Sequence, residues 1–146
     1  MKNMGLVDLV LVLAEPLDVG AAAIMAVHAR DVLARHRRVD TLADAIGDCG
    51  LVVGASGRAG GGHTDPASPR ALAPVILAAS AVNDVALVFG PEDHGLSNDE
   101  LMRCHRLLTI PAAAAYASLN LAQAVLVCGY ELRLAADTTR ANPEAR

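Results

Sequence analysis

The chain has 146 residues, a length that suits one domain with a buried core. Hydrophobic residues make up 53% and charged residues 19%, which excludes a disordered chain. The net charge of −4 is not the basic profile of most nucleic-acid binders, so any RNA contact must come from a local basic face or from dimerisation. Aromatic residues make up 2%, which argues against base stacking as the main mode of recognition.

The cysteines indicate a reducing compartment. Cys49, Cys104 and Cys128 are widely spaced and odd in number, which favours the cytoplasm over a disulfide framework. No Cys/His spacing resembles a zinc site, so we expect no metal. Asp8 interrupts the apolar run after Lys2, which argues against a secretory leader. No segment has the length of a membrane span without Pro, Asn or charge, so we expect no membrane contact.

The first part of the chain alternates strand and helix patterns. Residues 1–5 carry helix C-terminus signals. Residues 7–13 predict a buried strand, residues 15–20 a loop and residues 21–29 a helix. A basic cluster follows, and it is either a solvated face or a phosphate contact. Its members are Arg30, Arg35, His36, Arg37 and Arg38.

The middle of the chain holds a glycine-rich loop after a strand. Residues 41–49 predict a short helix capped by Thr41. Residues 51–53 predict a strand that ends in the loop 54–58, and the glycine-rich residues 59–67 predict flexible chain. The glycines are spaced G-x-x-G-x-x-G and no helix follows directly, so a Rossmann-like nucleotide-binding protein is a weaker alternative. A helix from Ser68-Pro69 to about residue 81 comes next.

Residues 85–89 form a continuous apolar run, which predicts a strand buried on both faces. Gly90 permits close backbone approach, and the loop after it holds three ionisable residues, Glu92, Asp93 and His94. The segment 97–100 reads as a capping box that starts a helix. Ligands bind at the carboxyl ends of strands in open α/β sheets, so this loop is a candidate site.

The last part predicts a strand over residues 107–110 and a helix over residues 119–136 with Ser118 as its N-cap. This helix is apolar nearly all round, so it must be buried on more than one side. A partner subunit explains this best in so short a chain, and a central core helix in a monomer is the alternative. Residues 138–146 predict a flexible tail.

The segment FGPEDHGLSNDEL, a strand ending in Ile110-Pro111, and then SLNLAQAV resemble motifs 2 and 3 of the SpoU branch of the SPOUT RNA 2′-O-ribose methyltransferases. Within that branch the chain is most similar to the TrmJ-type tRNA/rRNA methyltransferases. The resemblance implies an α/β domain over residues 1–137, with a mostly parallel sheet, helices on both faces and a C-terminal trefoil knot. It also implies S-adenosyl-L-methionine as cofactor, tRNA or rRNA as partner and a cytoplasmic homodimer.

The resemblance assigns roles to individual residues. Glu92, Asn120 and Ser118 are the catalytic candidates, against the plainer interpretation of a loop carboxylate and helix caps. Arg37, Arg38 and Arg58 are the candidates for RNA contact. The residues that match the cofactor pocket are Ala55, Ser56, Gly57, Gly90, Ile110, Ala117, Ser118 and Leu119.

The resemblance also bears on the N-terminus. Family members begin with a strand and a loop of the type Asn-x-Gly-Ala-x-Ala-Arg, motif 1, whose helix ends in a segment like residues 1–6 of this chain. We therefore expect an internal start or a truncated gene. Without the motif 1 Arg, a catalytically impaired remnant that binds cofactor or RNA is the alternative to an active enzyme.

Charge reversal at Arg37 and Arg38 should weaken RNA binding without changing the affinity for the cofactor, because the two side chains would contact phosphate only. Binding of each ligand to the variant measures this. Unchanged RNA binding would refute the phosphate contact and leave the basic cluster as a solvated face.

Overall fold

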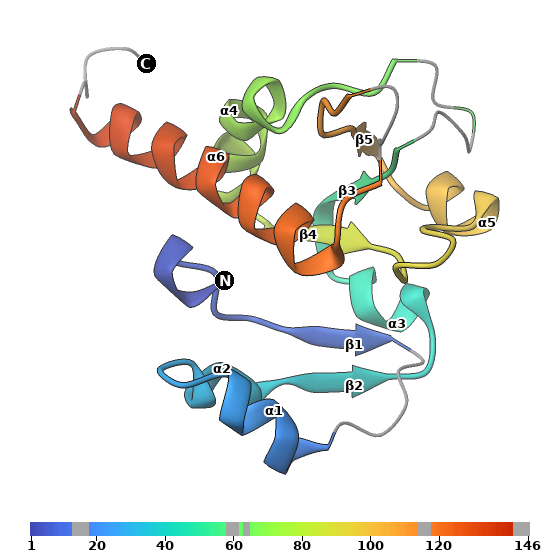
Figure 1. Ribbon diagram of the computed structural model, residues 1–146. Helices are drawn as coiled ribbons and strands as arrows, with labels where there is room; N and C mark the ends of the chain where they lie inside the picture. The colour runs from blue at the N-terminus through green and yellow to red at the C-terminus, as the bar shows by residue number, and fades with distance from the viewer. Residues whose placement is uncertain (13–17, 58–61, 63–64, 114–117, 142–146) are drawn as a thin grey trace. The chain divides into compact units, whose positions relative to one another are not determined.

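Figure 1 shows the computed structural model of the chain, which describes residues 1–12, 18–57, 62, 65–113 and 118–141. Two compact units, Met1–Gly47 and Asp48–Arg146, make up the chain, and each is described by itself. Among the helices within these described ranges, none combines the length and the apolar character needed to cross a bilayer.

The first unit contains a two-stranded parallel sheet. Strand β1 (Val10–Val12) pairs with β2 (Arg37–Val39), and the register joins Val10 to Arg37. Helices α1 (Val19–Met25) and α2 (Arg30–Arg35) lie between them in the chain, so the unit is a parallel β-α-β arrangement. Helix α3 (Leu42–Ile46) follows β2.

The start of the chain is attached to α2 by one lysine. The 3₁₀ turn Lys2–Met4 ends at Gly5, whose φ of 81° confirms the predicted helix C-terminus signals. The Lys2 Nζ donates hydrogen bonds to the backbone oxygen of His28 at 3.0 Å and to Asp31 Oδ1 at 2.7 Å. The bond from Lys2 lowers the pKa of the Asp31 carboxyl.

Several boundaries in this unit differ from the sequence-based prediction. The strand predicted over residues 7–13 forms only at Val10–Val12, and residue 13 lies outside the described residues. The helix predicted over residues 21–29 starts earlier, because the Asp18 side chain accepts a hydrogen bond from the Ala21 N–H at 3.0 Å. Strand β2 was not predicted, since so short a basic segment is a strand only through its pairing with β1.

The second unit has a three-stranded parallel sheet in the order β4-β3-β5. The central strand β3 (Cys49–Ala55) lies between β4 (Asp84–Phe89) and β5 (Arg106–Leu108). All three predicted strands are confirmed, although β3 includes two residues assigned to the loop by the sequence. Strand β4 is exposed at Asp84 and half-buried over the rest of its length, so the prediction that it is buried on both faces is wrong.

Helices cover both faces of this sheet. Helix α4 (Pro69–Ser80) packs against α6 (Leu121–Ala141), and both contribute to the core on one face. Side-chain direction alternates along a strand, so Gly54 points to the opposite face from Val53. There Gly54 lies against Leu96 and Cys104, which flank α5 (Asn98–Met102). The buried core on the α4–α6 face consists of Val53, Leu72, Ala73, Ile76, Leu108, Cys128 and Leu132.

Three helix starts were predicted correctly from local chemistry. In the first unit, the Thr41 hydroxyl accepts the Asp44 N–H at 3.1 Å at the start of α3. The Ser68 hydroxyl accepts the Ala71 N–H at 3.2 Å at the start of α4. Ser97 and Glu100 form a reciprocal capping box at the start of α5. Helix α6, however, starts at Leu121 and continues to Ala141, four residues into the segment predicted as a tail. Residues 142–146 lie outside the described residues.

Gly90 allows the loop after β4 to fold back on itself. A Cβ at this position would lie 2.2 Å from the backbone carbon of Gly95 and 2.4 Å from the Leu96 nitrogen. Gly95 in turn has a φ of 68°, which favours glycine. The loop can therefore take this form only with glycine at both positions.

We expect Gly90→Ala to lower the free energy of unfolding by about 3 kcal/mol, because the clash is with backbone that cannot rotate away. Urea denaturation measures it. Gly57→Ala is the matched control, since a Cβ at Gly57 meets nothing within 4 Å. Equal unfolding midpoints for the two variants would contradict the close approach.

Candidate functional site

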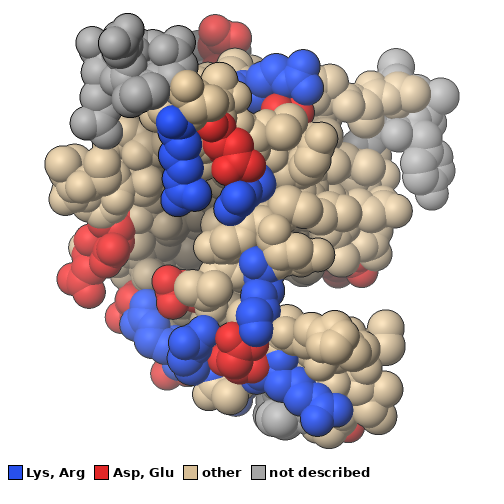
Figure 2. All heavy atoms as spheres, turned by 90° about the vertical axis from the view of Figure 1, so that its left-hand side faces the viewer, with Lys and Arg blue, Asp and Glu red and all other residues tan. Residues whose placement is uncertain are grey.

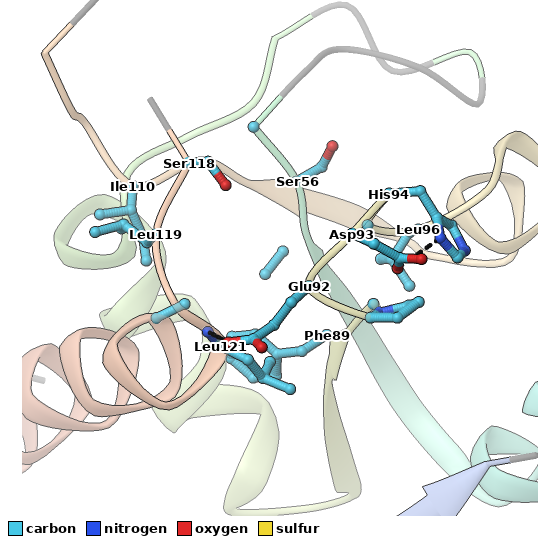
Figure 3. A pocket seen from close by; sticks show the side chains of 16 residues that line it. Ser56, Phe89, Glu92, Asp93, His94, Leu96, Ile110, Ser118, Leu119 and Leu121 are labelled. Carbon is cyan, nitrogen blue, oxygen red and sulfur yellow. Dashed lines mark hydrogen bonds and ion pairs between the residues drawn. The ribbon is translucent and has the colours of Figure 1, made fainter. Parts of the chain in front are cut away.

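A pocket of about 360 Å³ opens at the carboxyl ends of β3 and β4 (Figure 3). This is the place where open parallel sheets bind ligands. Its walls come from the end of β3, the loop after β4, the chain after β5 and the first turn of α6. In Figure 3, Ile110 and Leu119 lie on one side of the pocket, and Asp93 and His94 lie on the other. The pocket therefore joins apolar and ionisable side chains.

A carboxylate joins the two walls. Glu92 Oε1 accepts hydrogen bonds from Asn120 Nδ2 at 2.6 Å and from the Leu121 backbone N–H at 2.9 Å. The first backbone N–H groups of a helix have no partner within the helix, and a negative charge there is favourable. Glu92 thus fixes the loop after β4 to the start of α6.

The N-cap of α6 is Asn120. Its Oδ1 accepts the Ala122 N–H at 2.9 Å and the Gln123 N–H at 3.4 Å. The prediction that Ser118 caps this helix was wrong, because the chain turns into the helix two residues later. Ser118 instead lines the pocket.

Two neighbouring residues on the pocket loop form a second polar pair. His94 Nδ1 lies 2.7 Å from Asp93 Oδ1, as Figure 3 shows. Both side chains are largely exposed, at 67% for His94 and 78% for Asp93.

Backbone hydrogen bonds hold the β3 side of the pocket. The Ser56 N–H donates to the Leu108 oxygen at 2.9 Å, and the Thr109 hydroxyl donates to the Ser56 oxygen at 2.6 Å. At the other end of β5, His105 Nδ1 accepts the Val52 N–H at 2.9 Å, while the His105 N–H donates to the Val52 oxygen at 2.8 Å. The His105 imidazole therefore extends the sheet.

Neither of the two buried cysteines is a nucleophile at neutral pH. Burial raises the pKa of Cys128 to about 11, and burial followed by the Glu100 charge raises the pKa of Cys104. The thiolate is the reactive form, so both thiols stay protonated. In the described part of the chain, no three His, Cys, Asp or Glu side chains come close enough to hold a metal ion.

The structure brings together most of the residues that the sequence singled out. Asn120 joins them through its bond to Glu92. Ala117 and Arg58 lie outside the described residues. Arg37 and Arg38 lie in the first unit, on β2, where neighbouring side chains point to opposite faces of the sheet. The predicted residues that line the pocket are Ala55, Ser56, Gly57, Gly90, Glu92, Ile110, Ser118 and Leu119.

Sequence reasoning missed several other lining residues. Phe89 and Leu96 were assigned only to a strand and a loop, although their place beside Gly90 and Gly95 could have indicated the pocket. Leu121 and Ala124 were assigned to a helix face. Asp93 and His94 were noted as ionisable but not as site residues, and their adjacency was the available signal.

Comparisons with known proteins agree on one family. The family model of the SpoU rRNA Methylase family matches residues 1–130. The tRNA (cytidine/uridine-2′-O-)-methyltransferase TrmJ of Citrobacter koseri is 45% identical over 146 residues, which is 99% of this chain and 59% of that protein. The chain thus spans about three fifths of the length of the curated relatives that it matches.

Solved structures give the same result. A probable methylase family protein from Haemophilus influenzae Rd KW20 is 38% identical with a TM-score of 0.89, over 99% of this chain and 59% of that one. TrmJ from Z. mobilis ZM4 is 34% identical with a TM-score of 0.80, over 91% of this chain and 59% of that one. The likeness therefore covers both the sequence and the fold.

Glu92→Ala should lower the free energy of unfolding by about 1–2 kcal/mol, because it removes the acceptor for the Leu121 N–H at the start of α6. Glu92→Gln should cost less, about 0.5 kcal/mol, since an amide oxygen still accepts but carries no charge. Chemical denaturation measures both. Asp93→Ala is the control, because its carboxylate contacts no helix terminus; an equal loss in Glu92→Ala and Asp93→Ala would remove the anchoring role.

Proposed function

Because the chain belongs to the SpoU rRNA methylase family, we propose that it transfers a methyl group from S-adenosylmethionine to a ribose 2′-hydroxyl of tRNA or rRNA. The family match over residues 1–130 carries this proposal. Membership in this family replaces the weaker Rossmann-like alternative.

The pocket has the size and the lining that a small cofactor needs. Its volume of about 360 Å³ lies within the range of small-molecule sites, which are mostly apolar with a few polar groups. Phe89, Ile110 and Leu119 offer apolar surface, and Gly90 brings bare backbone to the wall. When bound, the cofactor supplies an electrophilic methyl group on a sulfonium. We assign its binding to Ala55, Ser56, Gly57, Gly90, Ile110, Ala117, Ser118 and Leu119.

Glu92, Asn120 and Ser118 are the residues that we place beside the ribose. In-line methyl transfer requires the hydroxyl oxygen to be held in line with the methyl group. Among the described residues, Glu92 Oε2 makes no hydrogen bond, so it is available to a ribose hydroxyl. Glu92 and Asn120 hold each other, which keeps both in one orientation before the substrate arrives. Ser118 contributes a hydroxyl to the same wall.

RNA binding must overcome an acidic surface. Figure 2 shows lysine and arginine side chains interspersed with acidic ones, in keeping with the ion pairs Arg70–Glu131 and Arg133–Asp137. We propose Arg37, Arg38 and Arg58 as phosphate contacts. Both Arg37 and Arg38 are exposed on β2.

We also propose that the protein is a cytoplasmic homodimer with a C-terminal trefoil knot, as the family resemblance implies. One exposed face of α6 supports the dimer. Leu126, Tyr130 and Leu134 follow each other at a spacing of four residues and are 48%, 50% and 41% exposed. An apolar stripe of this kind on a helix calls for a second surface to cover it. A second copy of the chain is the partner that we propose.

The first test is calorimetric titration with S-adenosylhomocysteine, followed by transfer of labelled methyl groups to bulk tRNA. We expect saturable binding and incorporation of label. Binding without incorporation would favour the impaired remnant over the active enzyme. No binding by a folded chain would contradict the proposed function.

A variant in the pocket makes this test specific. Gly57→Val should lower the affinity for S-adenosylhomocysteine by about tenfold or more, because the new side chain occupies open space at the pocket wall. Its melting temperature should stay close to native, since a Cβ at this position meets nothing within 4 Å. Ala81→Val, at the exposed C-cap of α4, introduces the same side chain outside the pocket and should bind as the native chain does.

A further inference from the structure

The carboxyl end of β5 is hydrogen-bonded to two other parts of the chain, the residue after β3 and a residue shortly before α4. The Leu108 oxygen accepts the Ser56 N–H at 2.9 Å. The Ala67 N–H donates to the Leu107 oxygen at 3.1 Å, and the Ala67 oxygen accepts the Thr109 N–H at 2.9 Å. Ala67 and Leu108 also form an isolated parallel bridge. Ser56 and Ala67, which flank one segment of the chain, are therefore both attached to the end of β5.

Thr109 bonds to both of these residues. Its N–H donates to the Ala67 oxygen, which fixes the backbone of Thr109 itself, and its Oγ1 hydroxyl donates to the Ser56 oxygen at 2.6 Å. This distance is at the short end of the range for hydrogen bonds between two oxygens. Since the Ser56 N–H donates to Leu108, both backbone polar groups of Ser56 are bonded to the end of β5.

The Ser56 carbonyl belongs to the peptide unit that leads into Gly57, and both residues line the pocket. A peptide unit is planar, so a bond that fixes its C=O also fixes the direction of the next N–H, here that of Gly57. Among the described residues, packing does little to fix it, since a Cβ at Gly57 would meet nothing within 4 Å and glycine has wide backbone freedom. The Thr109 hydroxyl therefore holds the backbone that forms this part of the pocket wall.

Thr109 also connects this wall to another part of the pocket. The next residue in the chain, Ile110, lines the pocket as Ser56 does. Thr109 itself is not among the described residues of the lining. In Figure 3, Ser56 lies at the end of β3, whereas Ile110 lies beside Leu119 at a different part of the wall. The bond from Thr109 to Ser56 thus sets the spacing between two parts of the wall.

We infer that Thr109 is a positioning residue for the cofactor, whose hydroxyl holds the Ser56–Gly57 peptide unit in the orientation that an S-adenosyl ligand requires. This role rests on the proposed function. A ligand that contacts backbone groups loses affinity when these groups are free to rotate, because binding must then order them. Thr109 acts through Ser56 and Gly57, so loss of its hydroxyl should change cofactor binding and not the chemistry at the ribose.

Calorimetric titration with S-adenosylhomocysteine tests this role with two variants of Thr109. Thr109→Val keeps the shape of the side chain and the backbone N–H but has no hydroxyl, and its affinity should fall by about three- to tenfold, the factor expected for loss of one hydrogen bond. Thr109→Ser keeps the hydroxyl and should bind within about twofold of native. Thr139→Val is the matched control, because it removes a hydroxyl that donates to the Ala135 oxygen at 2.9 Å within α6, and it should bind as the native chain does.

Kinetics separates a positioning role from a loss of folded protein. In methyl transfer to bulk tRNA, Thr109→Val should raise the KM for S-adenosylmethionine by the same factor, with kcat at saturating cofactor within about twofold of native. A variant that is merely less stable would instead lose kcat, because fewer molecules are folded, and would keep the native KM. A lowered kcat with a native KM would therefore overturn the positioning role.

The hydrogen bond itself can be tested in the free chain by NMR. Thr109→Val should shift the resonances of the Ser56 carbonyl carbon and the Gly57 amide, and Thr109→Ser should shift them much less, because these two groups share one peptide unit. A native chain that binds S-adenosylhomocysteine with the same affinity as Thr109→Val would overturn the role of Thr109 and leave the proposed function standing. A folded native chain that binds no S-adenosylhomocysteine would overturn both.

Discussion

The pocket depends on the contact between the Glu92 carboxylate and the start of α6. One carboxylate oxygen accepts from Asn120 and from the Leu121 N–H, and so closes a ring between the loop after β4 and the chain after β5. These two segments are far apart in sequence and both line the pocket. Removal of this charge would expose a helix terminus and release one wall, so shape and stability at the site are coupled.

The loop that carries Glu92 packs against the central strand of the sheet. Gly90 lies so close to Gly95 that the loop must turn back at once, and Leu96 is thereby placed against Gly54 of the central strand. The ring of His105 extends the same strand by accepting the Val52 N–H. On the opposite face, the exposed Arg70 and the largely covered Glu131 join α4 to α6 in an ion pair that lowers the pKa of Glu131. The contribution of this ion pair to the free energy of unfolding is therefore present near neutral pH, and it is lost as pH falls through the lowered pKa of Glu131.

The features that were predicted correctly from the sequence depend on interactions between residues close together in the chain. The caps at Ser68 and Ser97 and the turn at Gly5 each depend on neighbours three or four positions away, and all three were predicted correctly. Strand β2 depends on its partner β1, far along the chain, and was missed. The cap of α6 was predicted at Ser118, with Asn120 as a second cap residue, and the capping bonds are made by Asn120. The pocket residues known from the motifs were found, whereas Phe89 and Leu96 were missed although they adjoin the two glycines that shape the loop.

Neighbouring residues of the loop after β4 differ in their contacts. Glu92 is engaged with the protein, whereas Asp93 and His94 are exposed at the pocket wall. In the free chain, water screens their interaction, and such an exposed pair is worth little.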